Sequence, residues 1–219
     1  MTDDRQSTSL YGDSARREML PFVPGSARRI LDVGCNTGGF GATLKAARGT
    51  EVWGVEPNAA AAAQAEGRLD RVFCARFDAG LALSKAHFDA IVFNDVLEHI
   101  DDPWSALRYA ATLLAGGGVV VAAIPNLRHI DNLEHILLEA DFRYESHGVR
   151  DRTHLRFFTR KSAARLFDES GYDVLQATGI NASWWSPSPW RRLAFRLWRS
   201  RLEDTKYTQF AFVARPRTA

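Results

Sequence analysis

A glycine-rich turn contains the residues whose types and spacing most clearly point to chemistry. Residues 29–34 form an apolar run containing Asp32, and glycines follow as Gly34-x-x-x-Gly38-Gly39 before a helical stretch. Glycines in such a turn adopt positive φ and let a ligand approach the backbone closely. The amino end of the following helix offers free N–H groups and a partial positive charge. This pattern predicts a loop that binds a ligand carrying an anionic group.

An acidic residue ends the second apolar run. Glu56 lies 22 residues after Gly34, and a carboxylate at that distance can accept hydrogen bonds from two ribose hydroxyls. A tight turn with a surface glutamate is the simpler alternative, but it leaves the order of strand, glycines, helix and acid as coincidence. A nicotinamide oxidoreductase is a closer competitor. Its Gly-x-Gly-x-x-Gly spacing is not the spacing found here.

The elements that must position these residues alternate along the chain. Strand-like and helical runs alternate five times, which predicts a mostly parallel sheet with helices on both faces. The predicted strands are 29–34, 51–56, 71–74, 88–93 and 119–124, followed by 172–178 and 209–214. The predicted helices are 13–20, 39–47, 57–67, 103–115, 132–140 and 161–170, with glycines 116–118 ending the fourth and Thr159 capping the last.

The glycine turn resembles the first motif of the class I methyltransferases, which use S-adenosylmethionine. The chain resembles five motifs of this family in the family's order: the glycine turn at residues 31–38, then residues 55–57, 77–78, 93–99 and 116–126. The resemblance implies an α/β, Rossmann-like doubly wound fold, with a mostly parallel seven-stranded sheet and an antiparallel last strand. It also implies cofactor contacts from Asp32, Gly34, Cys35, Asn36, Gly38, Glu56, Pro57, Phe77, Asp78 and Asn94.

The candidate catalytic residues are His154, Asp151 and His99. Methyl transfer from a sulfonium is an in-line displacement, so it depends on positioning. A hydroxyl acceptor must also lose a proton to a base. In this interpretation His154 is the base and Asp151 orients it or the substrate. The alternative is that both only hold a loop in place. We predict no metal site, because the sequence contains no metal-ligand spacing.

Residues 154–159 read His-Leu-Arg-Phe-Phe-Thr. This element resembles uncharacterised bacterial methyltransferases of a glycan-associated type. The predicted function is therefore methyl transfer from S-adenosylmethionine to an oxygen of a small-molecule or saccharide acceptor. A protein that binds the cofactor without catalysis, as a sensor or partner subunit, is the alternative. Such a protein would keep Gly34, Gly38 and Glu56 but would not need His154.

A segment rich in arginine and aromatic residues precedes the last strand. Its arginines are Arg191, Arg192, Arg196, Arg199 and Arg201, and its aromatic residues are Trp184, Trp185, Trp190, Phe195 and Trp198. A helix over 184–201 could lie on a membrane surface. It could also cover the sheet while its arginines reach outward, and this packing interpretation is the one we favour from the sequence. Nucleic acid is not expected as a partner, because the net charge is only +2 and no wider basic surface accompanies this segment.

The composition limits the remaining possibilities. The chain has 219 residues, 46% of them hydrophobic and 25% charged, which suits one globular domain. We predict a helical cap at 1–27, a cofactor-binding core at 28–126, and acceptor-covering insertions at 127–158 and 183–203. Two cysteines and a polar amino terminus predict a cytoplasmic protein, with peripheral contact at the inner membrane surface as a further hypothesis. The sequence leaves open whether the chain forms a homodimer.

Overall fold

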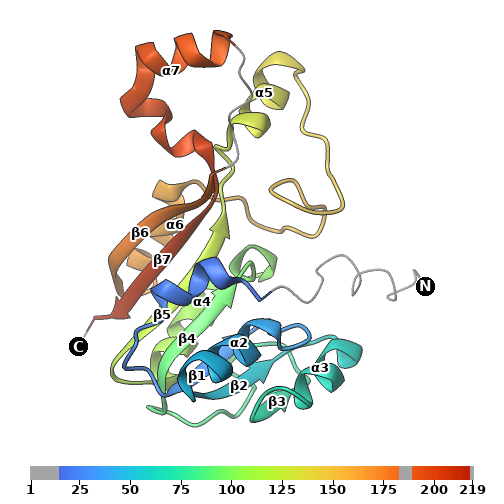
Figure 1. Cartoon of the computed structure of the whole chain (residues 1–219), viewed down its shortest axis with the longest axis vertical. Helices are drawn as coiled ribbons and strands as arrows, with labels where there is room; N and C mark the ends of the chain where they lie inside the picture. The colour runs from blue at the N-terminus through green and yellow to red at the C-terminus, as the bar shows by residue number, and fades with distance from the viewer. Residues whose placement is uncertain (1–14, 183–188, 218–219) are drawn as a thin grey trace.

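A seven-stranded sheet organises the protein. The structure, a computed structural model, describes residues 15–182 and 189–217. The strands are β1 (Arg29–Val33), β2 (Glu51–Val55), β3 (Arg71–Phe73), β4 (Phe88–Asn94), β5 (Leu114–Pro125), β6 (Tyr172–Ala182) and β7 (Tyr207–Pro216). Their order is β3-β2-β1-β4-β5-β7-β6, and β7 runs antiparallel to both of its neighbours. The predicted α/β fold, with a mostly parallel seven-stranded sheet and an antiparallel last strand, is confirmed (Figure 1).

Helices cover both faces of this sheet. They are η1 (Arg17–Phe22), α2 (Gly39–Arg48), α3 (Ala59–Glu66), η2 (Leu97–His99), α4 (Pro103–Leu113), α5 (Ile130–Leu138), α6 (Arg160–Glu169), α7 (Pro189–Leu202) and η3 (Glu203–Lys206). One core cluster packs α4 and α6 against the sheet, and a second packs η1, α2 and α3 against the other face. Strands β4 and β5 are nearly continuous apolar runs because both of their faces are covered.

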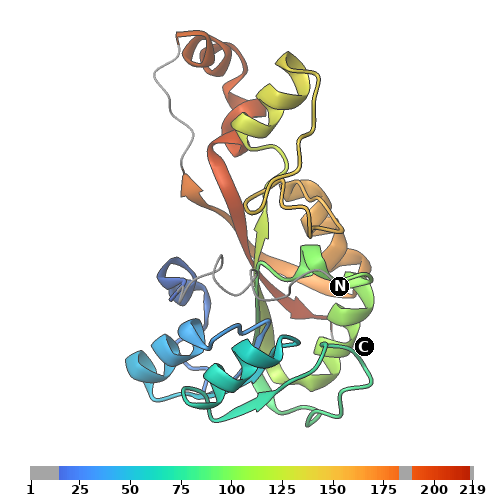
Figure 2. The ribbon, with the colours of Figure 1, turned by 90° about the vertical axis from the view of Figure 1, so that its right-hand side faces the viewer.

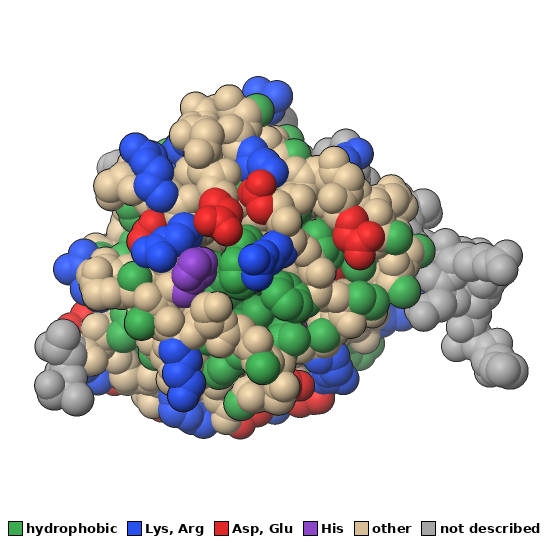
Figure 3. Space-filling view, turned by 90° about the horizontal axis from the view of Figure 1, so that it is seen from below, with side chains coloured by type: hydrophobic (Ala, Val, Ile, Leu, Met, Phe, Trp, Pro, Cys, Tyr) green, Lys and Arg blue, Asp and Glu red, His purple; other side chains and the backbone are tan. Residues whose placement is uncertain are grey.

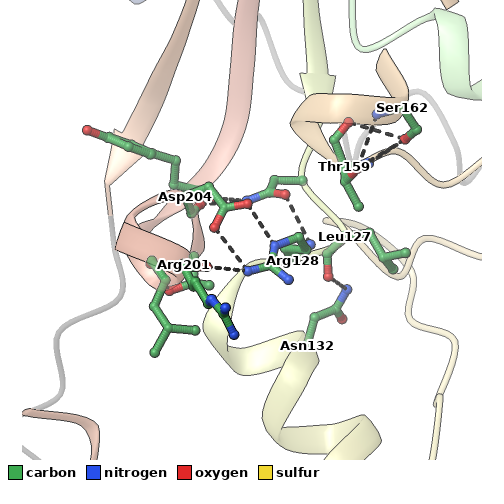
Figure 4. Close-up of polar contacts among 11 residues, drawn as sticks. Leu127, Arg128, Asn132, Thr159, Ser162, Arg201 and Asp204 are labelled. Atoms are coloured by element: carbon green, nitrogen blue, oxygen red, sulfur yellow. Dashed lines mark hydrogen bonds and ion pairs between the residues drawn. The ribbon is translucent and has the colours of Figure 1, made fainter. Parts of the chain in front are cut away.

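Local signals explain where several helices begin. Asn58 caps α3 by accepting hydrogen bonds from two backbone N–H groups of the first turn. Asp102 caps α4, and Pro103 occupies its first turn, where a missing N–H costs nothing. The predicted cap at Thr159 is confirmed: Thr159 and Ser162 form a reciprocal capping box at the start of α6 (Figure 4).

Two predicted boundaries were wrong. Glycines 116–118 do not end the helix at 103–115; α4 ends at Leu113, and the glycines lie inside β5. A Cβ at Gly118 would lie 3.0 Å from the Phe88 carbonyl oxygen. This glycine therefore lets the backbones of β5 and β4 approach closely, and it does not end a helix. The helix predicted at 13–20 is instead the 3₁₀ helix η1, displaced toward the carboxyl end, with Pro21 inside it.

Two helices lie beyond the carboxyl ends of β4 and β5. Figures 1 and 2 show α5 and α7 together at this end of the molecule. The opposite end is seen in Figure 3, where acidic and basic side chains are interspersed around a hydrophobic area, so no block of one charge covers that face. Among the described residues, none of the helices combines the length and apolar character needed to cross a bilayer.

Candidate active site

The glycine loop is held tightly between β2 and η2. Gly34 and Gly38 have φ of 68° and 82°, a conformation that favours glycine, and Asn36 also has positive φ. A Cβ at Gly34 would lie 2.5 Å from Cγ2 of Val96. The backbone N–H groups of Gly34 and Cys35 donate to the carbonyl oxygen of Val55. Gly34 is therefore required by packing as well as by any ligand.

Glu56 connects the loop to the next helix. Its two carboxylate oxygens accept from the backbone N–H groups of Asn36 and Asn58, each at 2.9 Å. A carboxylate has about four acceptor positions, so two remain for the hydroxyls of a ribose. The residue that the sequence predicts to bind the ribose thus also fixes the loop beside it.

Asp32 and Asn94 present buried polar atoms at the ends of β1 and β4. Oδ2 of Asp32 and both side-chain amide atoms of Asn94 have no hydrogen-bond partner among the described residues. Burial, together with the charge of Glu56, raises the pKa of Asp32 to about 7. Buried polar groups are normally paired. These atoms therefore suit a polar, charged ligand such as the ammonium and carboxylate of a methionine group.

The other predicted cofactor residues have varied surroundings. Cys35 is buried against Gly54, and burial raises the pKa of its thiol, so it is unreactive. Phe77 packs edge-to-face on Phe93 within the core. Pro57 and Asp78 are exposed. Since β1, β2 and β3 are adjacent and parallel, all of these residues lie along one edge of the sheet.

Two predicted catalytic histidines meet next to this edge. The rings of His99 and His154 are 4.7 Å apart between centroids, in a T-shaped arrangement. Nδ1 of His154 lies 3.1 Å from the carbonyl oxygen of Val149, and Nδ1 of His99 lies 3.2 Å from that of Thr153. A carbonyl can only accept, so each Nδ1 carries a proton, and in the neutral form of either ring Nε2 has the lone pair.

Asp151 acts on the loop that carries His154. Its Oδ1 accepts from the backbone N–H and the hydroxyl of Thr153, at 2.8 and 2.7 Å. Thr153 in turn contacts His99. The predicted orienting role of Asp151 is thus exerted through Thr153 and the backbone of the loop.

Sequence reasoning missed Glu98, although it lies within the motif at 93–99. Its side chain is 1% exposed, and neither carboxylate oxygen has a hydrogen-bond partner among the described residues. Oε1 lies 3.9 Å from Nε2 of His154. Burial and the charge of Asp95 raise the pKa of Glu98 well above its usual value. The available signal was an acidic residue directly before His99 and three residues after Asp95, inside a motif that the family resemblance had already singled out.

Sequence reasoning also missed a network of side-chain contacts around Asp95. Asp95 is paired with Arg16 and accepts from Nε2 of Gln209. Oε1 of Gln209 accepts from Asn181 at 2.7 Å. This chain of contacts joins the segment before η1 to β4, β7 and β6. Only the tertiary structure brings these four residues together.

A cavity of about 310 Å³ opens beside these groups. Its wall includes Glu98, His99 and His154, and it is completed by Asp95, Pro125, Gly148, Val149, Thr208 and Gln209. A space of this size suits a small ligand. The expectation that no metal-ligand constellation exists does not hold for this wall. Glu98, His99 and His154 each offer one ligand atom, and these atoms lie within 4.8 Å of one another.

Comparison with known proteins identifies the family. A family model described as a methyltransferase domain matches residues 8–177. The chain belongs to this family. It is an S-adenosylmethionine-dependent methyltransferase, and S-adenosylmethionine is its cofactor.

Named relatives agree with this assignment. A "Ubiquinone biosynthesis O-methyltransferase" of Neisseria meningitidis is 27% identical over 176 residues, which cover 74% of this chain and 72% of that protein. A protein of the same name from Alkalilimnicola ehrlichii is 38% identical over 110 residues, or 45% of this chain and 42% of that one. The solved structure of a SAM-dependent methyltransferase from Archaeoglobus fulgidus superposes with a TM-score of 0.65 at 20% identity, covering 96% and 95% of the two chains.

In the methyltransferase, the two segments beyond the sheet are joined at their bases. Arg128, ahead of α5, forms an ion pair with Asp204 in η3 and donates to the carbonyl oxygen of Arg201 (Figure 4). The side-chain amide of Asn126 donates to the carbonyl oxygens of Asp204 and Tyr207. These contacts connect the start of the 127–158 segment to the end of α7 and to η3.

Proposed function

We propose that this methyltransferase transfers the methyl group to an oxygen of a small-molecule or glycan-type acceptor bound in the 310 Å³ cavity. This proposal depends on one observation: two histidines and a buried carboxylate line the cavity at the carboxyl ends of the strands. Hydroxyl acceptors need a proton acceptor in this position. The names of the two bacterial relatives, both O-methyltransferases, support an oxygen acceptor.

His154 is the candidate base for this step. The carbonyl oxygen of Val149 holds its Nδ1, which leaves the lone pair on Nε2. Burial and the neighbouring His99 lower the pKa of His154, so the ring is neutral and able to accept a proton near pH 7. The acceptor oxygen then bonds to the methyl carbon, the carbon–sulfur bond breaks, and its electron pair stays on sulfur. The products are the methyl ether and S-adenosylhomocysteine.

We assign the cofactor to the edge formed by β1, β2, β3 and β4. The loop Gly34–Gly38, with Cys35 and Asn36, passes beneath the methionine part, while Asp32 and Asn94 face its charged groups. Glu56 binds the ribose hydroxyls. The adenine lies among Pro57, Phe77 and Asp78. The unpaired buried atoms of Asp32 and Asn94 support this placement.

Acceptor screening tests the proposed reaction. The purified chain would be incubated with labelled S-adenosylmethionine and sets of phenols, small hydroxy compounds and saccharides. Methyl ether formation that is lost in His154→Gln is the expected result. Tight binding of S-adenosylhomocysteine without transfer to any hydroxyl would favour the cofactor-binding sensor instead. Transfer only to amines would refute the oxygen assignment.

Calorimetry with S-adenosylhomocysteine tests the cofactor assignment separately. Glu56→Ala removes both the ribose contacts and two loop hydrogen bonds, so binding should weaken by at least tenfold. Glu66→Ala is the matched control, because Glu66 is an exposed carboxylate on the neighbouring α3. Equal weakening in both variants would contradict the role of Glu56.

We further propose that residues 127–158 and 183–203 cover the acceptor and that α5 and α7 rest on the inner membrane surface. Large apolar side chains at this end are exposed, including Leu138 at 79% and Trp190 at 78%. The exposed Arg192 and Arg196 would face anionic lipid. Residues 184–188 of the proposed contact lie outside the described residues. This exposure favours the membrane alternative over the packing one.

Vesicle sedimentation tests the membrane contact. The protein should bind vesicles containing phosphatidylglycerol, and reversing the charge of Arg192, Arg196 and Arg201 to Glu should abolish binding. Reversal of Lys85, Lys161 and Arg165, three exposed basic residues elsewhere, is the control and should leave binding intact. The hypothesis fails if the unchanged protein does not bind these vesicles.

A further inference from the structure

Three side chains of metal-ligand type converge on one wall of the cavity. Glu98, His99 and His154 each offer a ligand atom, and these atoms lie within 4.8 Å of one another. The separation between Oε1 of Glu98 and Nε2 of His154 is 3.9 Å. Two ligands at about 2.1 Å from one ion lie at most about 4.2 Å apart, so this pair can share an ion, whereas a pair at the 4.8 Å limit of the set would have to close by about 0.6 Å.

The carboxylate of Glu98 independently points to a cation. It is 1% exposed, it lines the cavity, and neither oxygen has a hydrogen-bond partner among the described residues. An unpaired buried carboxylate is costly, and proteins normally pair it or use it to bind a metal. Asp95, whose charge acts on Glu98, is already engaged by Arg16 and Gln209. Apart from Nε2 of His154 at 3.9 Å, Glu98 faces the cavity, so a cation bound there could pair with its carboxylate.

The hydrogen bonds made by Nδ1 of both histidines are of the kind that metal-bound histidines make. Metal-binding histidines usually donate the second ring N–H to a carbonyl or carboxylate, which fixes the ring. Here Nδ1 of His154 donates to Val149, and Nδ1 of His99 donates to Thr153, whose hydroxyl is held by Asp151. Both rings thus keep Nε2 as the nitrogen that can coordinate.

We propose that Glu98, His99 and His154 bind a divalent transition-metal cation, and that two hydroxyls on neighbouring carbons of the acceptor complete its coordination. The inference rests on the proposed methyl transfer to oxygen, gives His154 the role of ligand in place of base, and names the class of acceptor. Two imidazoles and one carboxylate suit Mn²⁺, Fe²⁺ or Zn²⁺ better than Ca²⁺ or Mg²⁺. Three protein ligands leave adjacent open positions. A pair of vicinal hydroxyls, as in a catechol or a sugar diol, fits two of these positions.

Coordination changes the proton step. A hydroxyl bound to the cation has a lowered pKa and releases its proton to solvent water. The resulting oxygen lone pair bonds to the methyl carbon, and the carbon–sulfur pair remains on sulfur as neutral S-adenosylhomocysteine. In this arrangement Nε2 of His154 is a ligand and does not take the proton itself.

Binding of Mn²⁺ alone tests the site. The full chain, freed of metal by chelator and dialysis, would be titrated with Mn²⁺ while the signal of the free ion is followed by electron paramagnetic resonance. One site per chain is expected. Glu98→Gln, His99→Gln and His154→Gln should each weaken it by at least tenfold. Glu66→Gln and His87→Gln, which remove the same groups elsewhere, should not change it. Unaltered S-adenosylhomocysteine binding would show that each variant is folded.

Two results would overturn the inference. One is the absence of Mn²⁺ binding by the unchanged protein, or binding that survives Glu98→Gln. The other is hydroxyl methylation at an unchanged rate in the presence of chelator, with loss of activity in His154→Gln. The second result would leave the proposed function standing, with His154 as the base. Conversely, Mn²⁺ binding without methylation of any hydroxyl would support the metal site and refute the proposed reaction.

Discussion

The cofactor edge and the acceptor end of this methyltransferase are built in different ways. At the cofactor edge, Asn36 and Glu56 meet across 20 residues of sequence, at the ends of two paired strands. At the acceptor end, His99 meets Thr153 across 54 residues, and Arg128 meets Asp204 across 76. The glycine loop and Glu56 of the first region belong to one strand–helix–strand unit. The second region exists only when distant segments fold together.

The largest effect is expected from His154→Gln, which tests whether the acceptor end can be altered without changing cofactor binding. Loss of His154, as base or as metal ligand, should lower kcat by about 10²- to 10⁴-fold. Binding of S-adenosylhomocysteine should change by less than about twofold, since His154 lies outside the cofactor edge. Steady-state kinetics and calorimetry measure the two quantities, with His87→Gln as the matched variant. A kcat within threefold of the unchanged protein would show that the histidine only holds its loop.

Gly34→Ala should act on the cofactor edge, so its main effect should be on cofactor binding and stability. The new methyl group would lie 2.5 Å from Val96, and the residue would be held at positive φ. We expect S-adenosylhomocysteine binding to weaken by roughly 10- to 100-fold and stability to fall by about 1–3 kcal/mol. Thermal melts and calorimetry measure both. Gly25→Ala meets nothing within 4 Å and is the control; an equal loss there would refute the packing argument.

A smaller effect is expected from Arg128→Ala. The variant loses the ion pair with Asp204 and the bond to the Arg201 carbonyl, so the base of the acceptor cover loosens. The KM for the acceptor should rise by roughly 3- to 10-fold, whereas cofactor affinity should not change. Arg217→Ala breaks comparable exposed pairs with Asp168 and Asp173 and serves as the control. An unchanged KM would mean that the two segments act independently.

The smallest effect concerns pH and Asp32. Its pKa is about 7 in the folded protein and near 3.8 when exposed. Between these values the folded state keeps a proton that the unfolded state has lost, so stability falls as pH rises through this range. The melting temperature of the cofactor-free protein should drop by several degrees from pH 5 to pH 7.5.

Comparison of two variants isolates the contribution of Asp32. Asp32→Asn should flatten this slope, because the amide does not titrate. Asp141→Asn, at an exposed carboxyl group, should leave the slope unchanged. If Asp32→Asn melts with the same pH dependence as the unchanged protein, the carboxyl group does not titrate in this range.

Much of the cofactor edge could be predicted from the sequence because its signals are local. Alternating apolar and helical runs predict a doubly wound sheet, and a glycine turn followed by Glu56 after one helix places the loop beside the acid. Strand pairing then aligns β1 with β2 and β4. The exceptions depend on neighbouring backbone, as at Gly118, where a Cβ would lie 3.0 Å from the carbonyl oxygen of Phe88.

Sequence patterns were sufficient to predict the fold class, the glycine loop and the two histidines to be tested. Three features required the folded chain: Glu98 is buried without a hydrogen-bond partner among the described residues, Nε2 of His154 lies 3.9 Å from it, and Arg128 joins the start of α5 to η3. The physical reason is that periodicity and turn chemistry act within a few residues. Burial and the pairing of polar groups depend on every segment that packs around them, and no local pattern contains that information.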